Sequence, residues 1–280
     1  MVKAIDYWCN LFTPEAIKVS VDSEDIGHPI KWWHMEDRWI GMDPEAFISM
    51  MDEAGMDKVI IPAAQMYSYQ LHKPVWDFKI KDVYAVTEKY PDRFVGLYGI
   101  NPFMKMNGVR ELELAVKEYG FKGALLHTYG YDKPLNHRDY WPFFAKCVEL
   151  DVAVVMQVGH SAEFMPSSQG QPILVDDIAL YFPELRIVAA HTGWPWVEEL
   201  IAISWKHSNV YIGTSAHAPK YWDKKLVDYL KTRGKGKVLF GTDWPTILYK
   251  EALDQVEALG LKEEVKAQVL RETAIKVFKL

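Results

Sequence analysis

Two histidines and one aspartate stand at or just beyond the ends of short apolar segments. They are His160 after 152–158, His191 after 185–190 and Asp243 after 238–241. A carboxylate and neutral imidazoles can share a divalent cation or move a proton to and from a bound substrate at neutral pH. We therefore expect an active site that contains His160, His191 and Asp243, of which His160 and Asp243 are also the candidate metal ligands.

Short apolar segments alternate with longer segments of helical period along the whole chain, which is typical of repeated βα units and a parallel sheet. One domain over residues 1–280, of the α/β class and with a (β/α)8 TIM barrel fold, is therefore expected. The eight expected strands are Val2–Cys9, Lys58–Pro62, Phe94–Ile100, Gly123–His127, Val152–Val158, Leu185–Ala190, Val210–Gly213 and Val238–Gly241.

Polar residues follow these strands with a regularity that matters for function, because the carboxyl ends of barrel strands meet on one face, where active sites of this fold lie. Turns are often polar for structural reasons alone, but the recurrence of His and Asp favours a site. The residues in question are Asn10, Gln65, Asn101, His127, His160, His191, Ser215 and Asp243. Of these we expect His127 and Asn10, together with Trp8 on the first strand, to contact the substrate.

Residues 11–42 separate the first strand from the first regular helix, and such a length is unusual for an ordinary loop, so a functional lid is expected there. His34 and Arg38 lie in this insertion among aromatic residues. A planar guanidinium is well suited to binding a carboxylate, which makes both residues candidates for substrate binding. The alternative is that these side chains only solvate the surface.

Three motifs together resemble the amidohydrolase superfamily, in particular its amidohydrolase-2 branch of hydrolases and nonoxidative decarboxylases, which have a metal-dependent-hydrolase-like barrel. They are Gln157-Val158-Gly159-His160, Ala189-Ala190-His191-Thr192-Gly193-Trp194-Pro195 and Phe240-Gly241-Thr242-Asp243-Trp244-Pro245. The resemblance implies that His160 is a metal ligand and that His191 binds or activates water or protonates the substrate. It also implies that Asp243 is a metal ligand and general base.

The first strand departs from the family pattern. The family has Asp-x-His-x-His there, whereas this chain has Asp6-Tyr7-Trp8-Cys9-Asn10. Trp8 cannot bind a metal, and Asn10 offers only a neutral amide oxygen, so half of the usual ligand set is missing. We therefore expect no metal rather than one divalent ion. The alternative is one divalent ion, such as zinc, held weakly by His160, Asp243, Asn10 and water.

The leading functional expectation is a hydrolase that cleaves a C–C, ester or thioester bond in an aromatic or β-keto-type carbonyl substrate with water activated by Asp243. One alternative is a nonoxidative decarboxylase, or carboxy-lyase, of an aromatic or related acid. In that case the same residues would position a carboxylate and protonate the ring carbon. Another alternative is a barrel that binds a ligand without catalysis.

Composition restricts the partners and the compartment. The net charge of −6, with both signs interspersed, gives no footprint for nucleic acid, and no apolar run is long enough to span a membrane. The two cysteines, Cys9 and Cys147, are far apart in sequence, which fits a reducing, cytoplasmic location. A small-molecule substrate is expected. The eleven tryptophans fit aromatic packing in the core or in a homo-oligomer interface, and a homo-oligomer is expected.

Overall fold

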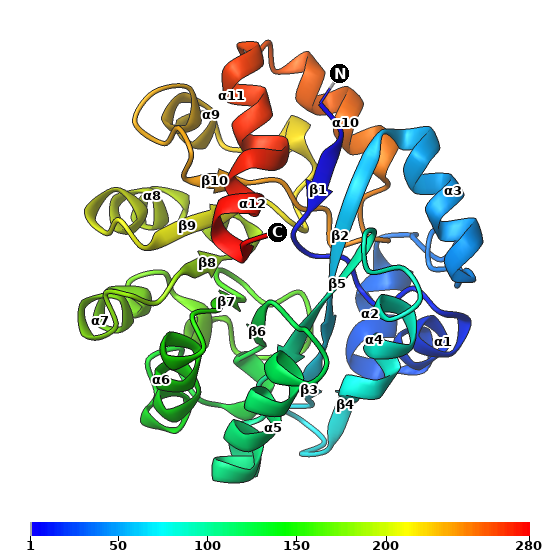
Figure 1. The fold of residues 1–280 in the computed structure, drawn as a ribbon, viewed down its shortest axis with the longest axis vertical. Helices are drawn as coiled ribbons and strands as arrows, with labels where there is room; N and C mark the ends of the chain where they lie inside the picture. Colours follow the sequence, from blue (N-terminus) through cyan, green and yellow to red (C-terminus); the bar gives the residue numbers. More distant parts are fainter. Residues whose placement is uncertain (1) are drawn as a thin grey trace.

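A sheet of eight strands forms the centre of the protein, which we describe from a computed structural model that covers residues 2–280. Every pair of neighbouring strands in this sheet is parallel. Their order follows the chain, as the ring of arrows in Figure 1 shows. The strands are β1 (Ala4–Asp6), β2 (Met56–Ala63), β5 (Phe94–Gly99), β6 (Gly123–Leu126), β7 (Ala153–Met156), β8 (Ile187–Ala189), β9 (Val210–Gly213) and β10 (Val238–Leu239).

The sheet closes on itself between its first and last strands. The Tyr7 backbone N–H donates to the Phe240 carbonyl oxygen at 3.2 Å, and a parallel bridge joins Cys9 to Trp244 just beyond the regular strands. The first and last strands of the sheet are thus joined by hydrogen bonds, and the closed sheet has no free edge strand. The expected (β/α)8 barrel is confirmed.

Eight helices follow the strands in turn and surround the barrel (Figure 1). The first of them begins as the sequence predicts. Asp43 accepts a hydrogen bond from the Ala46 N–H at 2.8 Å, Pro44 occupies the first turn, and Gly55 ends the helix with a φ of 88°. The helices are α3 (Pro44–Ala54), α4 (Ile80–Thr87), α5 (Lys105–Lys117), α6 (Trp141–Glu149), α7 (Leu174–Tyr181), α8 (Val197–Lys206), α9 (Lys224–Lys231) and α10 (Tyr249–Ala258).

The insertion at 11–42 contains two helices and is not irregular as expected. Helix α1 (Pro14–Asp22) is capped by Thr13, and helix α2 (Glu24–Trp32) is capped by Ser23. The two helices contact each other, and α1 also contacts the strand Pro74–Asp77. Pro29 lies inside α2, and because a proline usually interrupts a helix, the sequence did not indicate a helix there. That this segment acts as a lid stays a prediction.

Several expected strand boundaries were also too wide. Regular pairing in β1 ends at Asp6, although Val2–Cys9 was expected, because the backbone beyond it bonds alternately to two neighbours. The N–H of Cys9 donates to the Ile60 carbonyl oxygen, whereas the N–H of Asn10 donates to that of Trp244. A short antiparallel hairpin, β3 (Gln65–Tyr67) and β4 (Pro74–Asp77), which the sequence did not indicate, lies between β2 and α4.

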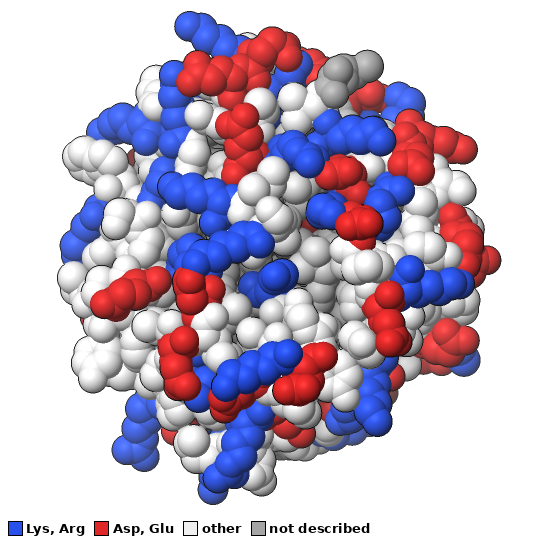
Figure 2. All heavy atoms as spheres, viewed as in Figure 1, with Lys and Arg blue, Asp and Glu red and all other residues white. Residues whose placement is uncertain are grey.

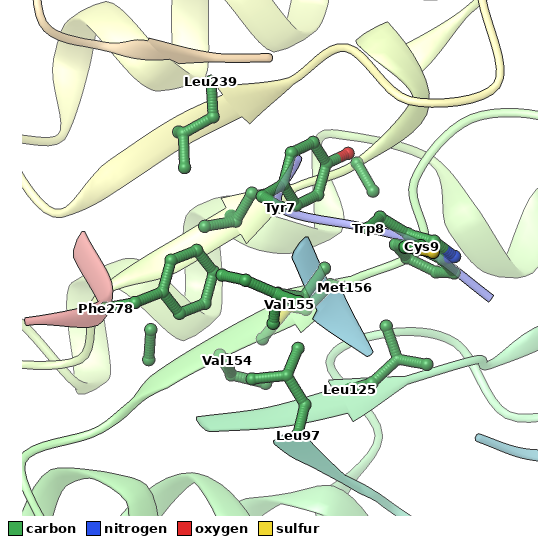
Figure 3. Close-up of a cluster of buried hydrophobic side chains, with 14 of the residues drawn as sticks. Tyr7, Trp8, Cys9, Leu97, Leu125, Val154, Val155, Met156, Leu239 and Phe278 are labelled. Atoms are coloured by element: carbon green, nitrogen blue, oxygen red, sulfur yellow. The ribbon is translucent and has the colours of Figure 1, made fainter. Parts of the chain in front are cut away.

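The C-terminal segment covers the end of the barrel opposite to the carboxyl ends of the strands. It consists of α11 (Glu263–Ala267), a π-helical turn over Gln268–Glu272 and α12 (Thr273–Phe278). The Arg186 side chain, just before β8, donates from Nε to the Val277 carbonyl oxygen at 2.7 Å. The Phe278 side chain is buried in the same cluster as Val154 and Leu239 (Figure 3). The substrate must therefore enter from the other end.

Charged side chains of both signs are intermixed on the face that carries the C-terminal helix, as Figure 2 shows. This face offers no continuous basic patch of the kind that binds a nucleic acid backbone. Among residues 2–280, none of the helices has both the length and the apolar character needed to cross a membrane.

Candidate active site

A cavity of about 660 Å³ opens at the carboxyl ends of the barrel strands. Its size is within the range of small-molecule binding sites. His160, His191 and Asp243 all line it, and so do Asn10 and the two lid candidates His34 and Arg38. The barrel thus brings together residues from the segment after β1, from the loops after β7, β8 and β10, and from the insertion. The chemical roles of these residues remain predictions.

Asp243 lies on the closure between β1 and β10. Its backbone N–H donates to the Trp8 carbonyl oxygen at 3.0 Å, and its Oδ1 accepts a hydrogen bond of 2.9 Å from Nδ2 of Asn10. Burial raises the pKa of the Asp243 carboxyl well above its usual range, and the Asn10 hydrogen bond offsets this only in part. The carboxyl group therefore holds a proton more readily than a solvent-exposed aspartate does.

His191 is fixed from two sides. Its Nδ1 lies 2.9 Å from Oγ of Ser215, and its ring packs on Trp8 with a centroid distance of 4.7 Å. Burial, and then the nearby His217, lower the pKa of His191 to about 3, so the ring is neutral at pH 7. His191 and Asp243 both have positive φ angles, of 61° and 56°. Such a conformation is strained for residues other than glycine and is often found at functional sites.

The rings of His160 and His217 both lie near the indole of Trp194. The His160 ring meets Trp194 edge to face at a centroid distance of 4.7 Å, and His217 lies 6.1 Å from the same side chain. Burial lowers the pKa of both histidines, that of His217 to about 4. Both are therefore neutral imidazoles at pH 7, able to donate or accept a hydrogen bond.

Two of the residues expected to contact substrate are not among those that line the cavity. Trp8 is buried, and its indole N–H donates to Oδ1 of Asn10 at 3.3 Å. His127 is 2% exposed, and neither ring nitrogen has a hydrogen-bond partner among residues 2–280. Each lies next to a residue that does line the cavity, Trp8 next to Asn10 and His127 next to Glu163.

Glu163 is a wall residue that the sequence reasoning missed. Its Oε1 lies 3.9 Å from Nε2 of His127, and its Oε2 accepts a hydrogen bond of 2.5 Å from the Ser161 hydroxyl. Burial opposes ionisation, but the His127 ring and the Ser161 hydroxyl outweigh it and lower the pKa of Glu163 to about 2. Its place three residues after His160, in a loop at the barrel mouth, is the signal that could have indicated it.

The donors around Asp243 do not form an ordinary metal site. No group of three or more His, Cys, Asp or Glu side chains within residues 2–280 is placed to hold an ion. Since an indole N–H can only donate, Trp8 turns the amide oxygen of Asn10 toward itself and its NH2 group toward Asp243. An NH2 group faces the carboxylate where a cation ligand would be needed, so the residues present do not fit a divalent ion in this arrangement.

Comparison with known proteins shows related enzymes. A gamma-resorcylate decarboxylase from Polaromonas sp. (strain JS666 / ATCC BAA-500) is 27% identical, with 83% of this chain and 86% of that protein covered. The protein is an enzyme, but the expectation of a hydrolase is wrong, because relatives that match over most of the chain are decarboxylases.

Solved structures share the fold. An uncharacterised TIM-barrel protein from Bordetella bronchiseptica has a TM-score of 0.76 and 20% identity, with 99% of this chain and 98% of that chain covered. A dihydroxybenzoic acid decarboxylase from Polaromonas sp. JS666, solved with manganese and the inhibitor 2-nitroresorcinol, has a TM-score of 0.74 and 20% identity, with 100% and 98% covered.

The manganese in that decarboxylase contradicts the expectation that the protein binds no metal ion. That expectation rested only on the ligand types of the first strand, whereas the decarboxylase of the same fold was solved with bound manganese. The family assignment itself holds across the chain, since the model of the family described as Amidohydrolase matches residues 5–280. This chain therefore belongs to the amidohydrolase family, within which the curated relatives that match it over most of its length are decarboxylases.

Proposed function

We propose that the protein is a nonoxidative decarboxylase of aromatic carboxylic acids. The reaction breaks the bond between the ring carbon and the carboxylate carbon, releases CO2 and places one proton on the ring carbon. It needs a proton donor next to the ring carbon and groups that hold the carboxylate. The decarboxylase relatives support this function, and the cavity supplies both kinds of group.

The observation that carries the proposal is the environment of Asp243. The carboxyl group is half-buried at the cavity wall, and desolvation raises its pKa although the Asn10 amide donates a hydrogen bond to it. It therefore holds a proton more readily than an exposed aspartate does, and can deliver that proton to a carbon atom. As CO2 leaves, the electron pair of the broken bond takes up the Asp243 proton, and the carboxylate regains one from water. This role replaces that of a base that activates water.

Neutral histidines suit the binding of the substrate. Because Nδ1 of His191 is engaged by Ser215, Nε2 is the nitrogen left to face the cavity, and a neutral imidazole there can hydrogen-bond a carboxylate. His160 stands on the same cavity wall against Trp194, whose indole is 47% exposed and offers a flat surface for an aromatic ring. Glu163, which is negative, disfavours a carboxylate at its own position.

The test is CO2 release from a panel of hydroxylated benzoic acids, including 2,6-dihydroxybenzoate, with and without added manganese chloride. In D2O the product should carry one deuterium at the carbon that bore the carboxylate, because the proton comes from an exchangeable carboxyl group. The Asp243→Asn variant is the matched control and should form product at least about 100-fold more slowly. Failure of every acid to release CO2, in both metal conditions and with correctly folded protein, would falsify the proposal.

A homo-oligomer and a cytoplasmic location stay predictions. Light scattering during size-exclusion chromatography measures the first, and fractionation of the source cells measures the second. A mass equal to one chain at micromolar concentration would contradict the homo-oligomer.

A further inference from the structure

The outer wall of the cavity carries two cationic side chains that come from distant parts of the chain. Arg38 follows α2 in the insertion, and Lys220 lies between β9 and α9. Glu251, in the first turn of α10, stands between them and also lines the cavity. The function proposed above makes use of none of these three side chains.

The contacts leave this wall with an excess of positive charge. Nη1 of Arg38 lies 3.3 Å from Oε2 of Glu251, and Nζ of Lys220 lies 4.0 Å from its Oε1. One carboxylate therefore faces two cations at distances that are long for ion pairs. Within residues 2–280, Arg38 makes its side-chain hydrogen bonds through Nη1 alone, so the other edge of the guanidinium is available to a bidentate anion.

Hydrogen bonds position the two residues that carry the cations. The side chain of Gln255 accepts a hydrogen bond of 3.1 Å from the Lys220 backbone N–H and donates from Nε2 to Glu251, also at 3.1 Å. Nη1 of Arg38 donates to the Thr246 carbonyl oxygen at 3.3 Å. Helix α10 and the residues before it thus fix the Arg38 guanidinium and the backbone of Lys220 against the same wall, which lowers the entropy lost when an anion binds.

This positive wall is near Asp243 but separate from it. Thr246 contacts both, since its carbonyl oxygen accepts from Arg38 and its hydroxyl lies 3.5 Å from Oδ2 of Asp243. A ligand whose reacting carbon lies at Asp243 can therefore reach the guanidinium of Arg38 by extending past Thr246 alone. The Glu163 side of the cavity, in contrast, is negative and cannot hold a second anionic group.

We propose that Arg38 and Lys220 form a second anion-binding subsite, and that the substrate is an aromatic acid with a second acidic group held there. This inference rests on the proposed function, in which the first carboxylate is released as CO2. The second carboxylate replaces Glu251 as the partner of the two cations, or adds to it, and is not lost in the reaction.

Binding of unreactive probes tests the subsite without any need for turnover. Isothermal titration calorimetry compares benzoate with benzene-1,3-dicarboxylate and benzene-1,4-dicarboxylate on the full chain. At least one dicarboxylate should bind about tenfold more tightly than benzoate, and the ratio should fall as salt is added. Arg38→Gln and Lys220→Gln should each bring this ratio toward one. Lys235→Gln is the matched control, because Lys235 lies outside the cavity and is likewise 4.0 Å from a glutamate.

The outcomes separate this proposal from the decarboxylase itself. Equal affinity for benzoate and both dicarboxylates in the wild-type protein overturns the subsite, as does a preference that survives both cavity variants. A clear preference for a dicarboxylate that Arg38→Gln removes, in a protein that releases CO2 from no acid, supports the subsite and rejects decarboxylation.

Discussion

The hydroxyl oxygen of Ser215 lies 2.9 Å from Nδ1 of His191, and the hydroxyl of Tyr7 contacts Ser215 from the barrel interior. This buried chain of polar groups fixes which nitrogen of His191 faces the cavity. Tyr7 can reach Ser215 because Gly213 and Gly241 leave room for its ring. A Cβ at either glycine would lie less than 2.5 Å from atoms of that ring.

Ser215→Ala should lower kcat/KM about three- to tenfold, the scale of one neutral hydrogen bond, because His191 loses the partner that orients it. The chemical shift of the His191 ring nitrogens should change, which loss of stability alone would not cause. Tyr7→Phe, which keeps the ring and removes only the hydroxyl, should give a smaller effect. Unchanged ring-nitrogen shifts in Ser215→Ala would show that Ser215 does not position His191.

Asp243→Asn should keep the fold but lower turnover about 100-fold or more, since the amide has the shape of the carboxyl group and cannot deliver its proton. Turnover and melting temperature are measured on the same preparation. A variant with near-normal turnover and clearly reduced melting temperature would assign Asp243 a structural role at the β1–β10 closure.

Asn10→His should raise the affinity for manganese at least tenfold over the wild-type protein, because it replaces an NH2 group that faces Asp243 with an imidazole ligand. The free ion is measured by electron paramagnetic resonance during titration. Asn10→Gln, which adds length but no ligand of this type, is the control. Equal manganese affinity in all three proteins would mean that residue 10 has no part in metal binding.

Asp6 should make stability depend on pH. Burial raises the pKa of this carboxyl from 3.8 to about 7, against hydrogen bonds from Thr242 and Trp8. Because the folded-state pKa is the higher one, the favourable contribution is complete below about pH 4 and is lost as the pH rises through about 7. The free energy of unfolding of the wild-type protein, relative to Asp6→Asn, should therefore fall by about 1.4 kcal/mol per pH unit in this window.

Urea denaturation at pH 4.5, 6 and 8 measures this difference for both proteins. The comparison cancels the titration of all other groups, which the two proteins share. A difference that stays constant over the three pH values would show that Asp6 is ionised throughout.

The sequence by itself determined the barrel, because eight short apolar runs alternate along the chain with longer segments of helical period. It also determined that His160, His191 and Asp243 lie on one face, since parallel strands carry their carboxyl ends together. These properties depend on local pattern and on chain order alone.

Only the tertiary structure decided which side chains reach the cavity and in what state. His127 ends an expected strand like the others, yet it does not line the cavity and lies next to Glu163, as Trp8 lies next to Asn10. Arg38 and Lys220 meet at Glu251 although long stretches of chain separate all three. The usual order of the pKa values is also reversed, because burial raises that of Asp243 whereas hydrogen-bond partners lower that of Glu163.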